Sequence, residues 1–522
     1  MTTYRSPWPA VEIPDVSLPD HILRTAGDQP DKPALVDGPS GRTITYGELA
    51  LGVQLLAAGL AQRGFGKGDV FAIYLPNVPE YAVALYGVAK AGGIATTINP
   101  LYTVDELTHQ LTDAGARYLL TIPLFLDKAR AAAERAGIEE VFVLGEAEGA
   151  TPVMALLAND GQLPEVAVDP DDVVVLPYSS GTTGLPKGVM VSHRNIVANC
   201  VQCQPILSMQ DDDRVLAVLP FFHIYGMVVL LSMGLSNGAT LVTMPRFDLK
   251  DYLQLLQDQR ITYAFIVPPI GLALARHPMV EEFDLSALRL VNSGAAPMSA
   301  ELEEAIGRRI GTLSAQGYGM TETATVLSAN PLDEAQVRHG SVGRLLPNVE
   351  SRVVDPVRGE DVAEGEQGEL WFRGPNVVKG YLNNPAATAS TFDADGWIHT
   401  GDIGYFDAEG YLYVVDRVKE LIKYKGLQIA PAELEAVLVQ HPAIADAAVI
   451  RVPDEEAGEI PKAFLVARSE VAPEDVMAFV AERVAPYKKV RRIEFVDEIP
   501  KSASGKILRR VLMAKEAESA DR

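Results

Sequence analysis

Short hydrophobic runs alternate with helix-like stretches along most of the chain. The run FAIYL at residues 71–75 predicts a buried strand, and residues 79–91 predict the helix that follows it. Two further runs, at residues 263–267 and 288–292, end at Pro-Pro and Ser-Gly pairs, which is typical of strands that deliver loops to a site. This alternation predicts a layered α/β fold.

The pattern changes near Gly340. Short alternating runs at residues 368–373 and 410–416 predict β-rich structure with tight turns. Beyond Asp416 the pattern predicts a smaller α+β unit that continues to the end of the chain. Because 522 residues exceed what one hydrophobic core usually serves, two or more domains are expected.

Composition and charge narrow the class of protein. Hydrophobic residues make up 48% and charged residues 22%, which is ordinary for a soluble enzyme. The formal net charge is −24, from 45 Lys and Arg against 69 Asp and Glu. This charge argues against a nucleic-acid or anionic-membrane partner, since both favour basic surfaces. Any anionic substrate must therefore be held by local basic residues.

The two cysteines, Cys200 and Cys203, fall on a predicted helix with i,i+3 spacing and no further ligands nearby. We therefore expect packing residues in a reducing compartment rather than a zinc site or a disulfide framework. The N-terminus lacks a signal-peptide pattern, no apolar run is long enough to span a membrane, and the C-terminus is not a peroxisomal address. A cytoplasmic enzyme without an integral membrane segment is expected.

The most informative segment is residues 178–189, YSSGTTGLPKGV, which follows the hydrophobic run at 173–177. It holds three glycines, four Ser or Thr residues and one lysine. Glycine lets backbone N–H groups approach an anion closely, so the segment predicts a polyphosphate-binding loop. An ordinary Gly/Ser turn is the alternative, and a Walker A loop does not fit the spacing. The candidate phosphate ligands are Ser179, Ser180, Gly181, Thr182, Thr183 and Lys187.

Four later segments also carry candidate chemistry. Residues 316–323 (QGYGMTET) combine an aromatic face, small residues, a hydroxyl and a carboxylate, and residues 397–402 place a carboxylate at the end of a short apolar strand. Residues 416–428 are rich in lysine but contain too many turn residues for one helix, and residues 500–510 carry Lys506 on a Ser/Gly loop. The alternatives are a capping or solvated carboxylate, a solvated helix face and a surface basic tail.

Taken together, these motifs resemble those of the adenylate-forming enzymes, a superfamily that includes acyl-CoA synthetases, non-ribosomal peptide adenylation domains and beetle luciferases. The motif sequences are most similar to those of 4-coumarate–CoA ligases and neighbouring fatty-acyl-CoA synthetases. The resemblance covers residues 45–506, with each motif in the expected order. It implies a large N-terminal domain (1–415), a hinge (416–421) and a mobile C-terminal lid domain (422–522). It also implies that a carboxylic acid and ATP give acyl-AMP, that CoA then takes the acyl group, and that Mg²⁺ takes part.

The resemblance assigns roles at the nucleotide site. Tyr318 is expected against the adenine, Thr321 at the phosphate, Glu322 at Mg²⁺, Asp402 at the ribose hydroxyls and Arg417 at the ribose or phosphate. The remaining implied nucleotide residues are Ala295, Ala296, Pro297, Gln316, Gly317 and the hinge residue Lys419.

The resemblance also implies catalytic and CoA-binding residues. Lys506 is expected to be the adenylation lysine, which leaves when the lid changes orientation. Lys423 and Gln428 are expected to serve the adenylate, and His223 to gate the CoA tunnel rather than to transfer protons. The implied CoA-binding residues are Arg246, Lys425 and Gly426.

The sequence does not determine the identity of the acyl substrate. The implied acyl-binding residues are Tyr225, Asn292, Ala295, Gly319, Thr325 and Val326. Asn292, Ala295 and Thr325 depart from the Lys, Gly and Pro often found in the plant enzymes. A hydroxycinnamate, another aryl acid and a medium-chain fatty acid all remain possible. An enzyme that loads a separate carrier protein, a luciferase-like oxygenase and a non-catalytic nucleotide-binding homologue are the alternatives. The sequence leaves the oligomeric state undetermined.

Overall fold

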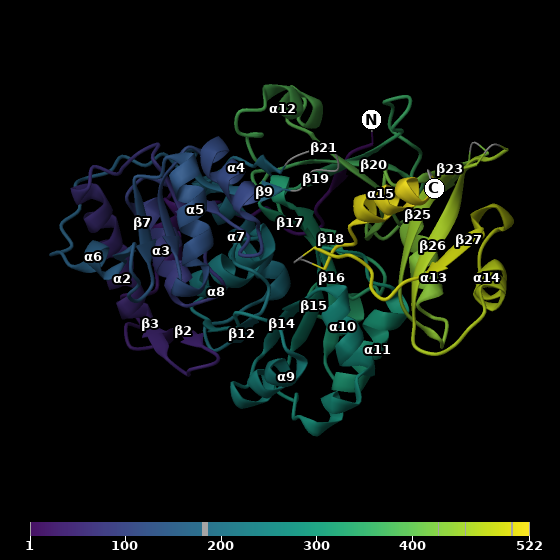
Figure 1. Ribbon diagram of the computed structural model, residues 1–522, viewed down its shortest axis with the longest axis horizontal. Helices are drawn as coiled ribbons and strands as arrows, with labels where there is room; N and C mark the ends of the chain where they lie inside the picture. Colours follow the sequence, from purple (N-terminus) through teal and green to yellow (C-terminus); the bar gives the residue numbers. More distant parts are fainter. Residues whose placement is uncertain (1, 180–185, 426, 455, 503–504, 521–522) are drawn as a thin grey trace.

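The computed structural model describes residues 2–179, 186–425, 427–454, 456–502 and 505–520. Three sheets and the helices around them form the N-terminal part, and a fourth sheet with three helices forms a smaller C-terminal part (Figure 1). We call this C-terminal part, from Ile422 onward, the lid. The mixed α/β architecture expected from the sequence is confirmed.

The first sheet contains the strand that leads into the predicted phosphate loop. Strands β4, β5, β6, β7 and β9 run parallel, and β10 and β11 pair with β9 in the antiparallel sense. Its strands are β4 (Val70–Ile73), β5 (Ile94–Thr97), β6 (Ala116–Thr121), β7 (Glu140–Val143), β8 (Thr151–Pro152), β9 (Val173–Ser179), β10 (Lys187–Gly188) and β11 (Val191–Ser192). The strand predicted at 71–75 is therefore confirmed as β4, and the hydrophobic run at 173–177 forms β9.

The second sheet brings several loops to one edge. Its parallel strands β14, β15 and β16 lie side by side, so the segments after their carboxyl ends meet there. The strands, in sheet order, are β18 (Arg344–Leu345), β17 (Thr325–Ala329), β16 (Leu313–Met320), β15 (Leu290–Ser293), β14 (Tyr263–Ile266), β12 (Arg214–Ala217), β13 (Thr240–Thr243), β2 (Pro33–Asp37) and β3 (Thr43–Thr45).

The third sheet is antiparallel, and it confirms the β-rich structure predicted after Gly340. Its order is β1 (Tyr4–Arg5), β19 (Glu350–Val354), β20 (Gly368–Arg373), β21 (Ile398–Phe406) and β22 (Leu412–Arg417). One expectation is wrong here. Asp402 lies within β21 rather than at the end of a short strand, because the strand continues through Gly401 to Phe406.

The lid has its own hydrophobic cores, one on each face of its sheet. The strands are β23 (Ile422–Tyr424), β24 (Leu427–Ile429), β25 (Ile444–Asp454), β26 (Gly458–Ala467) and β27 (Arg492–Phe495), and the helices are α13 (Pro431–Leu438), α14 (Pro473–Ala481) and α15 (Arg509–Ala520). The lysine-rich segment at 416–428 is thus strand and hairpin rather than one helix, as its turn residues predicted.

The other α-helices are α1 (Leu18–Ile22), α2 (Tyr46–Gln62), α3 (Glu80–Lys90), α4 (Val104–Ala114), α5 (Leu126–Ala136), α6 (Met154–Leu157), α7 (His193–Leu207), α8 (Met233–Ser236), α9 (Leu249–Asp258), α10 (Pro268–Arg276), α11 (Ala300–Ile310) and α12 (Pro385–Thr391). A wide helix, η2 (Tyr225–Ser232), precedes α8, and single turns occur at η1 (Pro123–Phe125), η3 (Pro278–Glu282), η4 (Thr321–Thr323), η5 (Glu334–Gln336) and η6 (Pro486–Lys488). Among the described residues, no helix combines the length and apolarity needed to cross a bilayer.

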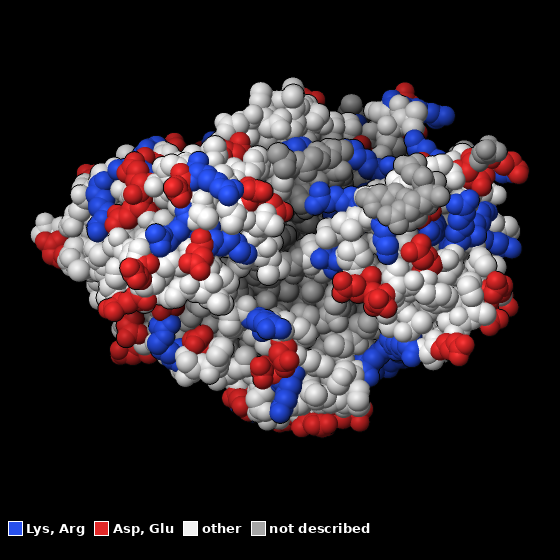
Figure 2. Space-filling view, in the orientation of Figure 1, with Lys and Arg blue, Asp and Glu red and all other residues white. Residues whose placement is uncertain are grey.

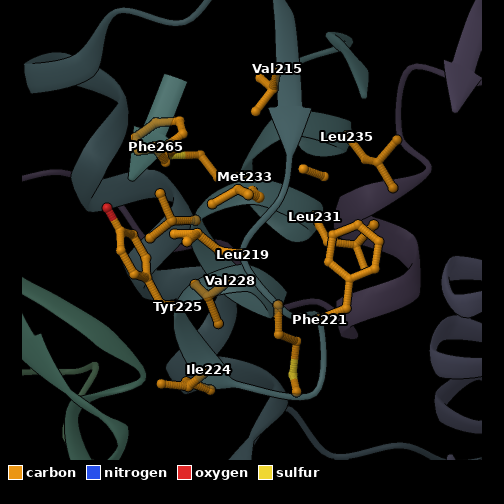
Figure 3. Packing of buried hydrophobic residues seen from close by; sticks show 14 of the residues in the cluster. Val215, Leu219, Phe221, Ile224, Tyr225, Val228, Leu231, Met233, Leu235 and Phe265 are labelled. Carbon is orange, nitrogen blue, oxygen red and sulfur yellow. The ribbon is translucent and has the colours of Figure 1, made fainter. Parts of the chain in front are cut away.

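The segment from Phe221 to Leu235 is buried in the main core, where it packs against strands of the second sheet (Figure 3). The Tyr225 ring meets Phe265 edge-on, with centroids 6.4 Å apart. Cys200 and Cys203 are free thiols buried on α7, which confirms that they are packing residues. The core therefore places Tyr225 at the edge of the sheet where the loops meet.

Candidate functional site

Three side chains from separate strands form a polar triad at the edge of the second sheet. The Tyr318 hydroxyl donates to Asp402 Oδ2 over 2.6 Å, and Arg417 Nε lies 3.1 Å from Asp402 Oδ1. Residues 402 and 417 are direct cross-strand partners on β21 and β22. Burial and the Asp402 charge raise the pKa of Tyr318, and the nearby carboxylates raise the pKa of Arg417 against the effect of burial.

A second cluster surrounds Glu322. Its Oε1 accepts hydrogen bonds from Ser179 Oγ over 3.1 Å and from the Tyr381 hydroxyl over 2.9 Å. Lys187 Nζ lies 5.1 Å from the centroid of the Tyr381 ring, and Lys187 pairs with Ser179 across β10 and β9. The described ends of the predicted phosphate loop therefore converge on the predicted metal-binding carboxylate. The predicted ligands Ser180, Gly181, Thr182 and Thr183 lie outside the described residues.

The donor set at Glu322 fits a magnesium ion that is shared with a nucleotide. Glu322 is a buried residue, and its Oε2 accepts no hydrogen bond from the described residues, so one carboxylate oxygen is left for a cation. Within the same described part, no group of three or more His, Cys, Asp or Glu residues could hold a metal without help. One carboxylate completed by phosphate oxygens and water is the arrangement that Mg²⁺ prefers.

The loop that carries Lys506 reaches the triad from the lid. Lys501 and Ile507 pair across the loop, and the Lys506 N–H donates to Ser502 Oγ over 3.2 Å. Gly505 packs on the N-terminal part, where a Cβ would lie 3.3 Å from Val267. Burial, reinforced by Arg417, lowers the pKa of the Lys506 ammonium to about 8.

The charge of Asp402 acts on Lys506 in the opposite direction, which places the amine near the Tyr318–Asp402–Arg417 triad. The lid therefore stands in the orientation that brings Lys506 to the predicted nucleotide site. Figure 2 shows a hollow between the lid and the rest of the molecule, with Lys and Arg side chains on its rim. Local basic charge thus borders the site in a strongly acidic protein.

An ion cluster anchors the end of this loop to the predicted hinge. Arg509 Nη2 donates to both carboxylate oxygens of Glu435, at 2.8 and 2.7 Å, and Arg509 Nη1 donates to Glu420. Asp416 Oδ2 accepts from the Ala432 N–H over 2.9 Å. Burial raises the pKa of Glu435 to about 7, although Arg509 opposes the shift. The loop base, α13 and the hinge segment are therefore joined.

His223 is held as a neutral acceptor. Its Nδ1 accepts from the Tyr225 N–H over 3.2 Å, which leaves the imidazole proton on Nε2. Burial, helped by the charge of Lys506, lowers the pKa of His223 to about 4. A ring that stays neutral near pH 7 is a poor proton donor, so the geometry agrees with a gating role.

The Gln316 side chain is occupied by protein contacts. Its Oε1 accepts from the Met298 N–H, and its Nε2 donates to Met298 O and to Glu303 Oε2, all between 2.8 and 3.0 Å. The amide group therefore holds the loop that contains Ala295, Ala296 and Pro297, three of the predicted nucleotide residues, which we call the predicted adenine wall. Gly317 approaches β17 closely, since a Cβ there would lie 3.2 Å from Ser328 O.

The predicted acyl residues come together around Tyr225. The Tyr225 hydroxyl donates to Asn292 O over 3.4 Å, and Thr325 Oγ1 donates to Ile224 O over 3.1 Å. Asn199 holds Val326 through both of its backbone groups, at 3.1 and 2.7 Å.

Two backbone positions in this region are unusual. A Cβ at position 319 would lie 1.4 Å from Thr325 O, so glycine is required at this irregular step between β16 and β17. Ala295 has a φ of 68°, the left-handed conformation that favours glycine, and its side chain is exposed.

Several predicted residues lie away from this assembly. Lys423 and Gln428 face each other on the β23–β24 hairpin and are exposed, and Lys425 pairs with Glu456 inside the lid. Strand β23 lies on the far side of the lid from β9 and β16 (Figure 1). Lys419 and Arg246 are exposed. Gly426 lies outside the described residues, so the CoA-binding prediction there stays a prediction.

Sequence reasoning missed four polar residues that shape the site. They are Tyr381, which bonds to Glu322; Glu303, which fixes Gln316; Asn199; and Asn376, whose amide donates to Thr323 O and Val326 O over 3.0 Å. No local pattern marks them, because isolated Tyr, Glu and Asn residues outside a motif are common everywhere. Spatial contact is the signal that identifies them.

The chain matches the family model of AMP-binding enzymes over residues 22–382 and that of the AMP-binding enzyme C-terminal domain over residues 433–506. It is 43% identical to 4-coumarate–CoA ligase of Pinus taeda, over 98% of this chain and 97% of the relative. It is 44% identical to 4-coumarate–CoA ligase 5 of Oryza sativa subsp. japonica, with the same coverage.

Solved structures agree with these relatives. The anthranilate CoA ligase AuaEII in complex with anthranoyl-AMP is similar with a TM-score of 0.91 and 28% identity, covering 98% of this chain and 99% of that one. A benzoate CoA ligase from Burkholderia xenovorans LB400 is similar with a TM-score of 0.86 and 28% identity, covering 95% and 99%. Sequence, fold and the ordered motifs agree, and the chain belongs to the family of AMP-binding enzymes.

Proposed function

We propose that this protein is an ATP-dependent acid–thiol ligase that acts on 4-coumarate-like aryl acids. A carboxylate oxygen attacks the α-phosphorus of ATP and pyrophosphate leaves; the CoA thiol then attacks the acyl carbonyl and AMP leaves. The observation that carries the proposal is the convergence of Lys506, Asp402 and Arg417 on one site. Among the relatives, the same chemistry is named in the 4-coumarate–CoA ligases and the anthranilate CoA ligase.

In the first step, the residues of this chain supply position and charge. Asp402 accepts hydrogen bonds from the ribose hydroxyls, and Tyr318 and Arg417 hold its carboxylate in place. Lys506 lies between the substrate carboxylate and the α-phosphate, where its ammonium stabilises the negative charge that builds up in the transition state. Such preorganised donors are commonly the largest single contribution to catalysis.

Magnesium completes the nucleotide site in this proposal. Glu322 would hold the ion through the oxygen that Ser179 and Tyr381 leave available, and Thr321 and Lys187 would lie at the phosphates. Bound there, the ion supplies charge neutralisation on the phosphate oxygens. The two hydroxyl donors orient the Glu322 carboxylate.

The second step uses another orientation of the lid. We place the hinge at residues 416–421, between an N-terminal domain at 1–415 and a lid domain at 422–522, with Lys419 as the pivot. Lys425 and Gly426 then meet the pantetheine arm of CoA, with Arg246 at a CoA phosphate, while Lys506 leaves. In the present orientation of the lid, Lys423, Lys425 and Gln428 are exposed, which supports the proposal that the two steps use different lid orientations.

The acyl pocket supports an aromatic substrate over a purely aliphatic one. The Tyr225 ring lies beside Asn292 and packs edge-on against the buried Phe265 ring, and aromatic rings favour edge or offset contacts with one another. A medium-chain fatty acid is the second candidate, because the segment around Tyr225 is otherwise aliphatic. We place the enzyme in the cytoplasm, since both cysteines are free thiols.

A panel of carboxylic acids tests the proposal directly. Purified protein is incubated with ATP, Mg²⁺ and either 4-coumarate, cinnamate, benzoate or octanoate, and pyrophosphate release and acyl-CoA formation are measured separately. We expect both products with the hydroxylated and plain cinnamates, and the thioester only when CoA is present. Pyrophosphate release without thioester formation would favour a carrier-loading enzyme, and failure to release pyrophosphate with any acid would favour a non-catalytic nucleotide-binding protein.

A further inference from the structure

A cavity of about 570 Å³ lies outside the nucleotide site, between the N-terminal segment and helices α1, α7 and α8. This volume is typical of small-molecule sites. The cavity wall includes Asp20, His21, Arg24, Cys200 and Val201. The proposed reaction uses none of them.

The one guanidinium in the wall lacks an acidic partner in the described residues. Arg24 Nη1 donates to His21 O over 2.8 Å and lies 3.3 Å from His21 Nε2. Within the described chain, no carboxylate oxygen lies within 4.0 Å of the Arg24 nitrogens and no hydrogen bond is made by Nε or Nη2. The planar Nε–Nη2 edge, which suits a two-pronged carboxylate contact, is therefore available.

Arg24 is exposed, so a ligand can reach its guanidinium from solvent, and it is the one cation among the residues of this wall. Desolvation by the surrounding wall lowers the pKa of Arg24. A hydrogen bond between two charged groups is stronger than one between neutral groups, so this edge favours an anionic ligand.

The other titratable groups in the wall do not cancel the charge of Arg24. Asp20 accepts from Ser17 Oγ over 2.6 Å and lies 3.7 Å from Lys90 Nζ, so its carboxylate is already partnered. Burial, reinforced by Arg24, lowers the pKa of His21 to about 4, which keeps the imidazole neutral near pH 7. Burial raises the pKa of the Cys200 thiol to about 12, so it also carries no charge.

Most of the remaining wall is apolar, including Val11, Pro14, Val16, Val201 and Pro205. We propose that this cavity is a second binding site, distinct from the nucleotide site, for a small monocarboxylate with an apolar body. The carboxylate takes the Nε–Nη2 edge of Arg24, and the apolar body lies against the valine and proline side chains. A phosphate dianion fits less well, because the wall offers it a single cation.

Helix α7 separates this cavity from the acyl region. Cys200 and Gln204 line the cavity, whereas the preceding Asn199 holds Val326 on the other side of the helix. A ligand in the nucleotide and acyl site therefore leaves the cavity free. The two sites can be separated experimentally by blocking the first one.

The test is equilibrium dialysis of the full chain with ¹⁴C-labelled cinnamate, in the presence of a saturating non-hydrolysable cinnamoyl-sulfamoyl adenosine. We expect one residual equivalent of bound cinnamate. Arg24→Met should weaken this binding by about 10- to 100-fold, the range expected when a hydrogen-bonded charged group is lost. Arg135→Met, which removes an exposed arginine paired with Asp105, is the matched control and should bind like the wild type.

Two further measurements separate the contribution of the charge from that of the cavity volume. Cinnamyl alcohol has the same apolar body without the charge and should fail to compete, and Val201→Phe should exclude cinnamate by filling the cavity without changing the charge. Thermal unfolding verifies that each variant is folded. If Arg24→Met does not fold, the Val201→Phe variant tests whether the cavity binds cinnamate. Absence of residual binding in the wild type, equal competition by the alcohol, or binding unchanged in the folded Arg24 or Val201 variant would overturn the proposal.

This test does not depend on the ligase chemistry. If the adenosine analogue failed to bind, the proposed function would be in doubt, but the dependence of cinnamate binding on Arg24 would still identify the cavity. If the ligase reaction were confirmed and Arg24 had no effect, only the second site would be lost.

Discussion

Gln316 donates a hydrogen bond from Nε2 to Oε2 of Glu303 over 2.8 Å, so a buried carboxylate on α11 fixes a side chain of the nucleotide motif. The same amide group holds Met298 by both of its backbone groups. Glu303 Oε2 also accepts from the Gly340 N–H over 3.0 Å. Position 303 thus acts on the predicted adenine wall through Gln316, without touching a ligand itself.

Replacing Glu303 with leucine should therefore weaken ATP binding more than acid binding. We expect the KM for ATP to rise by roughly 10-fold, since the loss of one charge-assisted contact costs about 1.5–3 kcal/mol, while the KM for the acid changes little. Glu303→Gln, which keeps an acceptor, should restore most of the loss. ATP–pyrophosphate exchange at varied ATP and acid measures both constants; equal changes in the two would assign Glu303 a merely structural role.

Lys506→Ala should block acyl-AMP formation and spare the second half-reaction. Losing one preorganised donor commonly costs ~10²–10³-fold in rate, and the loop that carries Lys506 is expected to leave when the lid reorients. Pyrophosphate exchange reports the first step, and acyl-CoA formation from pre-made acyl-AMP reports the second. Lys515→Ala, a change on α15 of the lid, serves as the control. Equal loss of both half-reactions would contradict the proposal.

The adenylation rate should depend on the protonation of Lys506. Its pKa is lowered to about 8, and only the protonated amine stabilises negative charge. The kcat/KM for adenylation should thus be full below pH 8 and fall as the pH rises through that value, since kcat/KM follows the free enzyme. Bound phosphates favour the ammonium form, so the corresponding limb of kcat should lie at higher pH. Lys506→Arg should shift the kcat/KM limb upward; an unchanged limb would assign it to another group.

Tyr381→Phe removes one of the two donors that orient Glu322 and leaves the ring beside Lys187. We expect a higher Mg²⁺ concentration for half-maximal pyrophosphate exchange, by roughly 10-fold, as for other hydrogen bonds to charged groups. The stacked, more distant pair Tyr405 and Tyr413 supplies the control variant Tyr405→Phe. A reduced rate with the same Mg²⁺ dependence would mean that Tyr381 does not orient Glu322.

Ala295→Gly tests whether the unusual backbone at this position has a functional consequence. Glycine adopts a φ of 68° without strain, so the variant should fold at least as stably as the wild type. If Ala295 lines the acyl site, kcat/KM for ring-substituted cinnamates should gain over a short aliphatic acid, by roughly 10–200-fold at most for one methyl group. Thermal unfolding and a two-acid assay verify both parts. A uniform change across the acids, with a higher KM for ATP, would place Ala295 at the adenine instead.

The strands that deliver the site were predictable because their hydrophobic runs end abruptly at Gly, Pro and Ser residues. Strands β4, β14 and β15 lie where these runs predicted them, within a few residues. The position of Asp402 was not predictable in this way. Glycine at 401 and a polar residue at 402 read as the end of a strand, yet pairing with β22 carries β21 through both. Tertiary pairing overrides local propensity at such positions.

The motif residues were predictable as a set, but their supports were not. Ser179, Tyr318, Glu322 and Asp402 stand in dense local patterns, whereas Tyr381 approaches Glu322 from 59 residues away along the chain. Glu303 looks like an ordinary residue on an amphipathic helix, and only its contact with Gln316 distinguishes it. Long-range hydrogen bonds leave no periodic trace in a single sequence.

The ion cluster at Arg509 limits where the lid can turn. Arg417 is tied to Asp402, and the Val418 N–H donates to Gly401 O over 2.8 Å, so the backbone is fixed to the N-terminal part up to that residue. From Glu420 onward, the contact with Arg509 binds the chain to the lid. The proposed pivot, Lys419, lies between these two anchors, and the Glu420 and Leu421 N–H groups donate to Arg417 O across it, so turning there would break both hydrogen bonds. A rotation of the lid would break the hydrogen bond between the Ala432 N–H and Asp416. The loop that carries Lys506 would move together with the lid as one rigid body.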